Sequence, residues 1–311
     1  MNNRPSRYFI VGSEWLYYKL YTGYKTADLI LTEIIKPITE YLVQEGLVDK
    51  WFFIRYGDPN HHLRIRFHLT RQNHLNKVIS ALHTPLRKFM NQDLIWKIQL
   101  DTYQRELERY GIHTMELSET LFFHDSRAIV NFLDLIEGGE GEQLRWLYGL
   151  RSIDSLLDSF KYHLKQKLSL LEVLKIGFGR EFGMSRPLKK QLDAKYRNER
   201  ENIEAFMLFT KDTNPDYEPI LSNLSEKNQA IRPLTERISI LIKERKPGLV
   251  LDDLLGSYTH MLLNRLFKSQ NRLNEMVCYD FLFRYYRTLS ALQSKTLNYL
   301  DKKRHSQQRS S

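Results

Sequence analysis

The sequence predicts an α+β fold, in which a mainly antiparallel sheet with helices is followed by a largely α-helical C-terminal portion. Two observations support this prediction. Apolar and polar residues alternate, as they do in half-buried strands, mainly before residue 112. After Gly111 the strand signals fade, and apolar residues recur three and four positions apart, as in amphipathic helices. We therefore expect one domain with an α+β portion at 1–111, a helical portion at 112–300 and a basic tail at 301–311.

The first portion contains two kinds of periodic segment. Strands are expected where β-branched and aromatic residues alternate with polar ones, and helices where an apolar stripe recurs every three or four residues. Gly46 is a natural C-terminal stop for the first helix. The expected strands are Arg7–Val11, Trp15–Thr22, Trp51–Tyr56, His62–Phe67 and Trp96–Tyr103, and the expected helices are Thr26–Gly46 and Asn73–Asn91.

The two central strands form a predicted antiparallel hairpin, with the sequence WFFIRYGDPNHHLRIRF at 51–67. Gly, Asp, Pro and Asn at 57–60 supply the turn. The second strand alternates strictly, so His62, Arg64 and Arg66 point to one face and apolar residues to the other. Two arginines about 7 Å apart on one strand face repel each other unless a negative group lies between them. The alternatives are a solvated face, arginines paired with acids of this chain, and an anionic ligand.

Beyond residue 111 the predicted elements are helices. Gly138-Gly139 and the glycine-rich stretch at 177–183 are expected to separate neighbouring helices. The last ten residues are rich in Lys and Arg and are expected to be disordered. The predicted helices are Met115–Ile136, Glu142–His163, Leu168–Ile176, Leu249–Phe267 and Leu273–Leu300.

One of these helices, Leu249–Phe267, carries a line of polar residues on an otherwise apolar surface. Its members are spaced four, three and four positions apart, so they share one face: Asp253, Ser257, His260 and Asn264. A polar line on a buried helix must contact other polar groups. The histidine is either a hydrogen-bonded core residue or a catalyst, and the spacing alone leaves both interpretations open.

The net charge of +10 indicates attraction to a negatively charged partner. The positive residues are scattered, and none lies within a recognised nucleic-acid motif. We therefore expect no direct nucleic-acid binding. Attraction of an acidic peptide substrate explains the charge equally well.

The composition, with 27% charged and 42% hydrophobic residues, is that of a soluble globular protein. The single cysteine, Cys278, excludes an intramolecular disulfide and a cysteine-cluster metal site. The ten histidines include no HExxH motif, and we predict no metal and no redox cofactor. Neither a signal peptide nor a stretch of about 20 apolar residues is found, so we expect a cytoplasmic protein without a membrane span.

Three separated motifs carry a resemblance to a known family. They are FFIRYGDPNHHLRIRF in the hairpin, ERYG at Glu108–Gly111, and SYTHMLLNRL at Ser257–Leu266. Together they resemble the C-terminal, glutamate-eliminating domain of lantibiotic dehydratases, which also occurs in thiopeptide-type bacteriocin biosynthesis proteins. The resemblance covers roughly the whole chain and lacks the N-terminal glutamylating portion. It implies a single elimination-type domain that acts as a separate protein.

The resemblance also implies a set of site residues. Matched positions make His260, Arg64, Arg66, Arg109 and Glu106 catalytic, and the expected substrate-binding residues are Arg64, Arg66, His62 and Asn264. Without the resemblance, Glu106 and Arg109 are equally well interpreted as a salt-bridged strand end. One position departs from the family, which commonly has a second glycine where this chain has Ile112.

The implied reaction is a β-elimination. A Ser or Thr side chain of a ribosomally made precursor peptide, already esterified with glutamate, loses free glutamate and becomes dehydroalanine or dehydrobutyrine. Arginine suits the departing carboxylate because its planar fork binds it in a bidentate way, and histidine suits the proton transfer because its pKa lies near working pH. The resemblance implies no cofactor and two partners, namely the glutamylated precursor peptide and a separate glutamylating dehydratase subunit that would use glutamyl-tRNA.

Two alternatives remain open from the sequence. Pyridine synthases of thiopeptide pathways resemble the same fold but carry out a cycloaddition with elimination of the leader peptide. In the second alternative, the chain is a non-catalytic, peptide-binding subunit of a modification complex. The arginine pair and the histidine favour glutamate elimination.

Overall fold

The computed structural model describes residues 5–136, 140–244 and 248–308. The chain forms two compact units, one made of Met1–Phe160 with Thr210–Asn271, and one of Lys161–Phe209 with Arg272–Ser311. The first unit contains the sheet and the hairpin, and the second is helical. The predicted α+β class, with its antiparallel sheet first and helices dominating afterwards, is confirmed. The assignment of 1–311 to one domain, with boundaries at 111 and 300, stays a prediction.

The main sheet has four antiparallel strands in the order β3-β4-β2-β5. The predicted hairpin is confirmed as β3 and β4, with Phe52 opposite Arg66 and Ile54 opposite Arg64. Leu63, Ile65 and Phe67 of β4 are fully buried and form part of the core. The strands are β2 at Trp15–Tyr21, β3 at Val48–Tyr56, β4 at His62–Leu69 and β5 at Lys97–Leu100.

The predicted strand Trp96–Tyr103 is wrong as a single element, because it divides into β5 and β6 (Tyr103–Gln104). β6 leaves the main sheet and pairs with β1 (Tyr8–Phe9). Between the two strands, Asp101 accepts a hydrogen bond at 2.7 Å from the backbone N–H of Thr102. Such a local side-chain bond competes with strand pairing and favours a turn.

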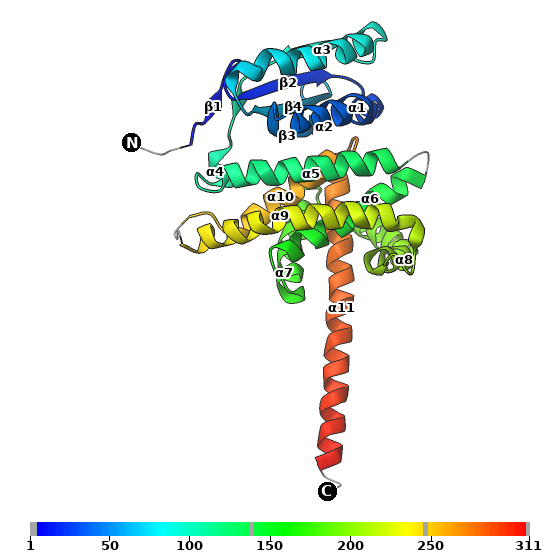
Figure 1. Ribbon diagram of the computed structural model, residues 1–311. Coiled ribbons are helices and arrows are strands. Elements are labelled where there is room, and N and C mark those ends of the chain that lie inside the picture. Colours follow the sequence, from blue (N-terminus) through cyan, green and yellow to red (C-terminus); the bar gives the residue numbers. More distant parts are fainter. Residues whose placement is uncertain (1–4, 137–139, 245–247, 309–311) are drawn as a thin grey trace. The chain divides into compact units, whose positions relative to one another are not determined.

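The helices of the N-terminal portion lie alongside the sheet (Figure 1). The predicted helix Thr26–Gly46 is present, but a π-helical turn divides it, and Gly46 ends it with a positive φ of 64°. The predicted helix Asn73–Asn91 is also present. The elements are α1 at Tyr24–Ile30, η1 at Leu31–Ile35, α2 at Lys36–Gln44, η2 at Gln72–His74 and α3 at Leu75–Asn91.

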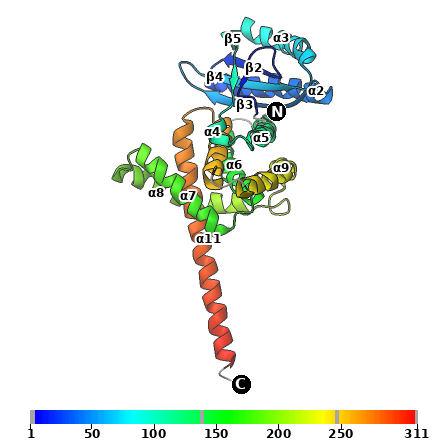
Figure 2. The same cartoon turned by 90° about the vertical axis from the view of Figure 1, so that its left-hand side faces the viewer.

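The remaining helices of the first unit form layers beneath the sheet. Both views place α5 directly below the sheet and α9 beyond it (Figure 1, Figure 2). The backbone N–H of Phe53 on β3 donates to Ser126 on α5, which joins the two layers. The helices are α4 at Leu107–Tyr110, α5 at Met115–Leu135, α6 at Glu140–Ser159, η3 at Pro215–Tyr217, α9 at Glu218–Glu244 and α10 at Leu251–Leu266. The predicted break at Gly138-Gly139 lies outside the described residues.

The second unit contains α7 (Leu164–Glu181), α8 (Arg186–Leu208) and α11 (Asn271–Gln308). Two predictions need correction here. The predicted break at 177–183 is only partly right: Gly177 and Gly179 lie inside α7, because a helix tolerates a glycine at a cost of about 1 kcal/mol, and α7 ends at Glu181, with Gly183 at a φ of 58° just beyond it. The tail predicted to be disordered continues α11 as far as Gln308, since Lys, Arg and Gln are good helix formers, while 309–311 lie outside the described residues. Within the described part of the chain, we find no helix with the length and apolar character needed to span a membrane.

Candidate active site

The polar face of β4 carries the side chains that the alternation pattern predicted. Residues opposite one another on neighbouring antiparallel strands share a face, so Arg66 lies beside Tyr17 on β2 and Phe52 on β3. Arg64 lies beside Lys19 on β2. The face is therefore both cationic and aromatic.

Arg66 is a buried cation in an aromatic enclosure. Only 7% of the residue is exposed, and its guanidinium carbon lies 4.4, 4.8 and 5.2 Å from the ring centres of Tyr17, Tyr103 and Phe52. Among the residues that the structure describes, its Nε and Nη1 have no hydrogen-bond acceptor, and no carboxylate lies within ion-pair distance. Burial lowers the pKa of Arg66, yet an arginine stays protonated in a protein. Its unused donors therefore favour an anionic ligand.

Arg64 is held in place by its neighbours on the hairpin. Its Nε donates to Nε2 of His62 at 3.0 Å, and its guanidinium lies 3.4 Å from the ring centre of Tyr56. Lys19, directly opposite, pairs with Asp101, so the charge of Lys19 is compensated. Within the described ranges, no carboxylate pairs with Arg64 in the same way. Arg64 is thus a second cation available to an anion on this face.

His62 is buried, and both of its ring nitrogens are engaged. Because Nε2 accepts from Arg64, the proton lies on Nδ1, which donates to the carbonyl oxygen of Asn60 at 2.8 Å. Burial lowers the pKa of His62, and the charge of Arg64 lowers it further, which favours the neutral ring. In this geometry His62 orients Arg64, and its predicted role in binding substrate stays a prediction.

The short helix α4 presents Glu106 and Arg109. Nη1 of Arg109 lies 3.5 Å from the carboxylate of Glu106, and its Nε donates to Oγ of Ser257 on α10 at 3.0 Å. The Glu106 carboxylate is exposed, and its charge acts on the Arg66 guanidinium. Gly111 ends this helix with a φ of 76°, and a Cβ there would lie 2.7 Å from Oγ1 of Thr114. Through the hydrogen bond between Arg109 and Ser257, the second and third motifs are in direct contact.

The polar line on α10 faces both α4 and β3. Ser257 accepts from Arg109. About two turns further on, the Asn264 amide accepts from the backbone N–H of Arg55 and donates to its carbonyl oxygen, both at 3.0 Å. His260 is half-buried and lies between these two residues on the same side of the helix. The structure therefore brings α10 to the hairpin. The side-chain amide of Asn264 is hydrogen-bonded to the β3 backbone, and its predicted role in binding substrate stays a prediction.

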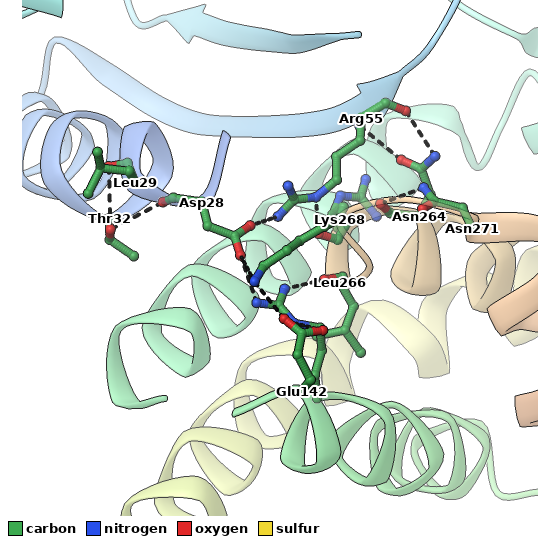
Figure 3. Close-up of polar contacts among 11 residues, drawn as sticks. Asp28, Leu29, Thr32, Arg55, Glu142, Asn264, Leu266, Lys268 and Asn271 are labelled. Carbon is green, nitrogen blue, oxygen red and sulfur yellow. Dashed lines mark hydrogen bonds and ion pairs between the residues drawn. The ribbon is translucent and has the colours of Figure 1, made fainter. Parts of the chain in front are cut away.

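Two residues inside the motifs were missed by the sequence reasoning, namely Arg55 and Arg265. Arg55 is buried, donates to Asp28 and to the carbonyl oxygen of Arg265, and lies next to Asn264 (Figure 3). Arg265 is fully buried and donates to the carbonyl oxygen of Phe53 at 2.8 Å. The sequence contains a sign of both residues. Arg55 lies two positions after Phe53 on the strand, so its side chain points to the same face, and Arg265 lies on the apolar side of its helix. An arginine at an apolar position must meet polar partners.

No group of three or more His, Cys, Asp or Glu residues in the described ranges is arranged to hold a metal ion.

The comparison with protein families adds the decisive observation. Residues 15–286 match the family described as the C-terminal part of lantibiotic biosynthesis dehydratases. The chain belongs to this family.

Two curated relatives support the family assignment. The subtilin biosynthesis protein of Bacillus subtilis is 23% identical over 274 residues, which cover 85% of this chain and 25% of that protein. The nisin biosynthesis protein of Lactococcus lactis subsp. lactis is 32% identical over 126 residues, which cover 40% of this chain and 12% of that protein. This lantibiotic dehydratase family member thus spans a quarter or less of the relatives it matches.

Two solved structures share the fold. A tRNA-dependent lantibiotic dehydratase from Microbispora sp. 107891 superposes with a TM-score of 0.69 at 21% identity, covering 88% of this chain and 28% of that one. The pyridine synthase from thiomuracin biosynthesis gives a TM-score of 0.59 at 14% identity, covering 89% of this chain and all of that one. The fold of the dehydratase C-terminal family therefore occurs both within a long dehydratase and as a whole shorter protein.

Proposed function

We propose that this chain is a lyase that eliminates glutamate from glutamylated Ser or Thr residues of a precursor peptide. The observation that carries the proposal is Arg66, a buried guanidinium with unused donors in an aromatic enclosure, with Arg64 beside it on the same face. The leaving group of the elimination is a carboxylate whose negative charge develops in the transition state. Preorganised cationic donors in a water-poor site stabilise such a charge strongly.

The other residues have complementary roles in the proposal. The His260 imidazole removes the α-proton of the esterified residue, the electrons of the C–H bond form the new C=C bond, and the C–O bond to glutamate breaks. Arg64 and Arg66 bind the departing carboxylate. An esterified glutamate keeps an ammonium group and a second carboxylate, for which the exposed Glu106 and the adjacent Arg109 are complementary. No cofactor is needed for these steps.

The substrate in this proposal comes from a separate glutamylating dehydratase. Residues 15–286 match the family of dehydratase C-terminal parts, and two relatives are named for nisin and subtilin biosynthesis. In the proposal, the substrate is a precursor peptide that such a dehydratase has glutamylated.

A cycloaddition of the pyridine synthase kind is the second candidate. It is favoured by one observation, namely that the chain covers the whole length of the pyridine synthase from thiomuracin biosynthesis. The arginine-rich hairpin face, which offers donors to a leaving carboxylate, favours elimination instead.

The test is to incubate the purified chain with a glutamylated precursor peptide and to follow the peptide mass. We expect each modified residue to lose one glutamate. His260→Gln keeps hydrogen bonding without proton transfer, and its elimination rate should fall about a hundredfold, so that glutamylated peptide accumulates. Elimination by His260→Gln at the normal rate would exclude His260 as the base. A wild-type chain that leaves the ester intact but cyclises a dehydrated peptide would establish the second candidate, and one that binds the peptide without converting it would be a non-catalytic subunit.

A further inference from the structure

An ionic cluster built around two buried arginines lies at the C-terminal end of α10 (Figure 3). The carboxylate of Asp28 on α1 accepts from Nη2 of Arg55 at 2.6 Å and from Nη2 of Arg145 on α6 at 2.7 Å. Both arginine side chains are almost completely buried, with 1% and 3% exposed. Nζ of Lys268, just beyond α10, lies 3.7 Å from the same carboxylate and 2.5 Å from Glu142. One half-buried acid thus orients two buried arginines.

The same two arginines close the end of α10. The last carbonyl oxygens of a helix accept no hydrogen bond from within the helix, so they need donors from elsewhere. Nε of Arg55 donates to the carbonyl oxygen of Arg265 at 2.8 Å, and Nη1 of Arg145 donates to that of Leu266 at 2.7 Å. Asp28 therefore holds the groups that terminate the helix carrying His260.

A second set of bonds fastens α10 to the hairpin. β3 is an edge strand of the sheet in the part of the chain that the structure describes, and two side chains of α10 bond to its outer backbone groups. Asn264 pairs with both backbone groups of Arg55, and Arg265 donates to the carbonyl oxygen of Phe53. Arg55 belongs to both sets, because its backbone binds Asn264 and its side chain joins Asp28 to the end of α10. The first and third motifs are thereby connected at one residue.

We propose that Asp28 is a positioning residue that fixes α10 on β3 and so sets the place of His260 relative to the Arg64 and Arg66 face. This inference rests on the proposed elimination. Without the Asp28 charge, the two buried guanidinium groups repel each other and lose their common acceptor, which releases the end of the helix. Reaction rates are sensitive to such shifts, since a displacement of about 1 Å costs about a hundredfold in rate.

The electrostatics of the cluster are consistent with a charged Asp28. Burial alone would raise the pKa of the Asp28 carboxyl, but Arg55 and Arg145 outweigh burial and hold this pKa below its ordinary value. The carboxylate therefore remains ionised at neutral pH and attracts both arginines. Replacement by asparagine, which has almost the same shape, removes the charge and leaves one acceptor oxygen for the two arginines.

The first test compares Asp28→Asn with a matched control. Asp280 in the second unit is a buried carboxylate that likewise has two cationic partners, Arg284 at 2.6 Å and Lys175 at 2.8 Å, and both partners belong to the second unit. In the elimination assay we expect kcat of Asp28→Asn to fall about tenfold to a hundredfold while KM changes less than about threefold. Asp280→Asn should keep kcat, and Asp28→Glu, which restores the charge, should recover part of it. Equal kcat in Asp28→Asn and the wild type would overturn the proposal.

The second test needs no catalytic activity. Hydrogen exchange should become faster at 262–268 and 53–56 in Asp28→Asn and stay unchanged there in Asp280→Asn. Unchanged protection of these amides in Asp28→Asn would refute the proposal that Asp28 fixes α10 on β3, even in a chain that shows no elimination at all. If Asp28→Asn does not fold, Arg145→Lys, which keeps the charge but loses the fork, should give the same changes at a smaller size. An unaltered Arg145→Lys would then reject the proposal.

Discussion

At the scale of single residues, the most informative feature is the contrast between two buried arginines. Arg105 is fully paired, since Nε and Nη2 donate to the two carboxylate oxygens of buried Glu119 at 2.7 and 2.6 Å. Arg66 is enclosed by aromatic rings, and within the described part of the chain its Nε and Nη1 have no acceptor and no carboxylate lies within ion-pair distance. Cation–π contacts offset only part of the cost of removing a charge from water. The protein thus carries a destabilising group on the face where an anion would bind.

This contrast gives a prediction with opposite signs for stability and activity. Arg66→Met should leave the free energy of unfolding unchanged or raise it by about 1 kcal/mol, because an unpaired buried charge is replaced by an apolar chain. The same variant should lose elimination activity, and Arg66→Lys should lose most of it because the fork is gone. As a control, Arg105→Met should destabilise by about 3 kcal/mol, because it leaves Glu119 unpaired. Urea unfolding and the peptide mass assay measure both effects; a strongly destabilised but active Arg66→Met would make Arg66 a structural residue.

The sequence predicted this face only in part. Strand alternation is a local property, so it correctly placed His62, Arg64 and Arg66 together. Besides Phe52 on β3, the rings around Arg66 come from β2 and β6, and no local pattern determines which strands become neighbours. Likewise, the pairing of Lys19 with Asp101 depends on β5 lying next to β2. Compensation of charge on this face could therefore not be assigned from the sequence.

At the scale of elements, the same limit applies to α10. Its helical period was clear, and the predicted Leu249–Phe267 agrees closely with the observed Leu251–Leu266. Its contact with the edge of β3 was not predicted, because that contact joins residues about 210 positions apart. Of the predicted polar line, Ser257 and Asn264 meet polar groups as expected, His260 lies between them, and Asp253 is exposed at the start of the helix. Two of those groups are now identified as Arg109 and the backbone of Arg55.

The contact between α10 and β3 predicts a structural role for Asn264. Asn264→Leu removes the partner of two backbone groups of Arg55 and should lower the free energy of unfolding by about 2–3 kcal/mol. Asn202 on α8 is exposed and donates to Glu199, so Asn202→Leu should stay within about 0.5 kcal/mol of the wild type. Denaturant unfolding of the two variants gives the comparison. A raised KM in Asn264→Leu with unchanged stability would instead assign Asn264 to substrate binding.

At the scale of the whole molecule, buried histidines make stability depend on pH. Burial lowers the pKa of His61, His62 and His124 below the ordinary value of 6.5, and neighbouring arginines lower it further. These rings are neutral in the folded chain and bind protons more readily when it unfolds. The carboxyl groups whose pKa is lowered, such as Asp28 and Asp49, have an ordinary pKa of 3.8. Their titration therefore changes the stability only at more acidic pH. The two effects are therefore separated along the pH scale.

The last prediction follows from the sign of this linkage. Below pH 6.5 the unfolded chain binds more protons at these histidines than the folded chain, so the free energy of unfolding should fall as the pH decreases from about 6.5 toward the lowered folded values. Above about pH 7.5 both states are neutral at these rings, and their contribution should be constant. Urea unfolding at a series of pH values between about 5 and 8 measures the slope. His62→Gln removes one titrating ring and should flatten the slope. A stability that is constant or rises on acidification over this range would show that these histidines are accessible to protons in the folded chain.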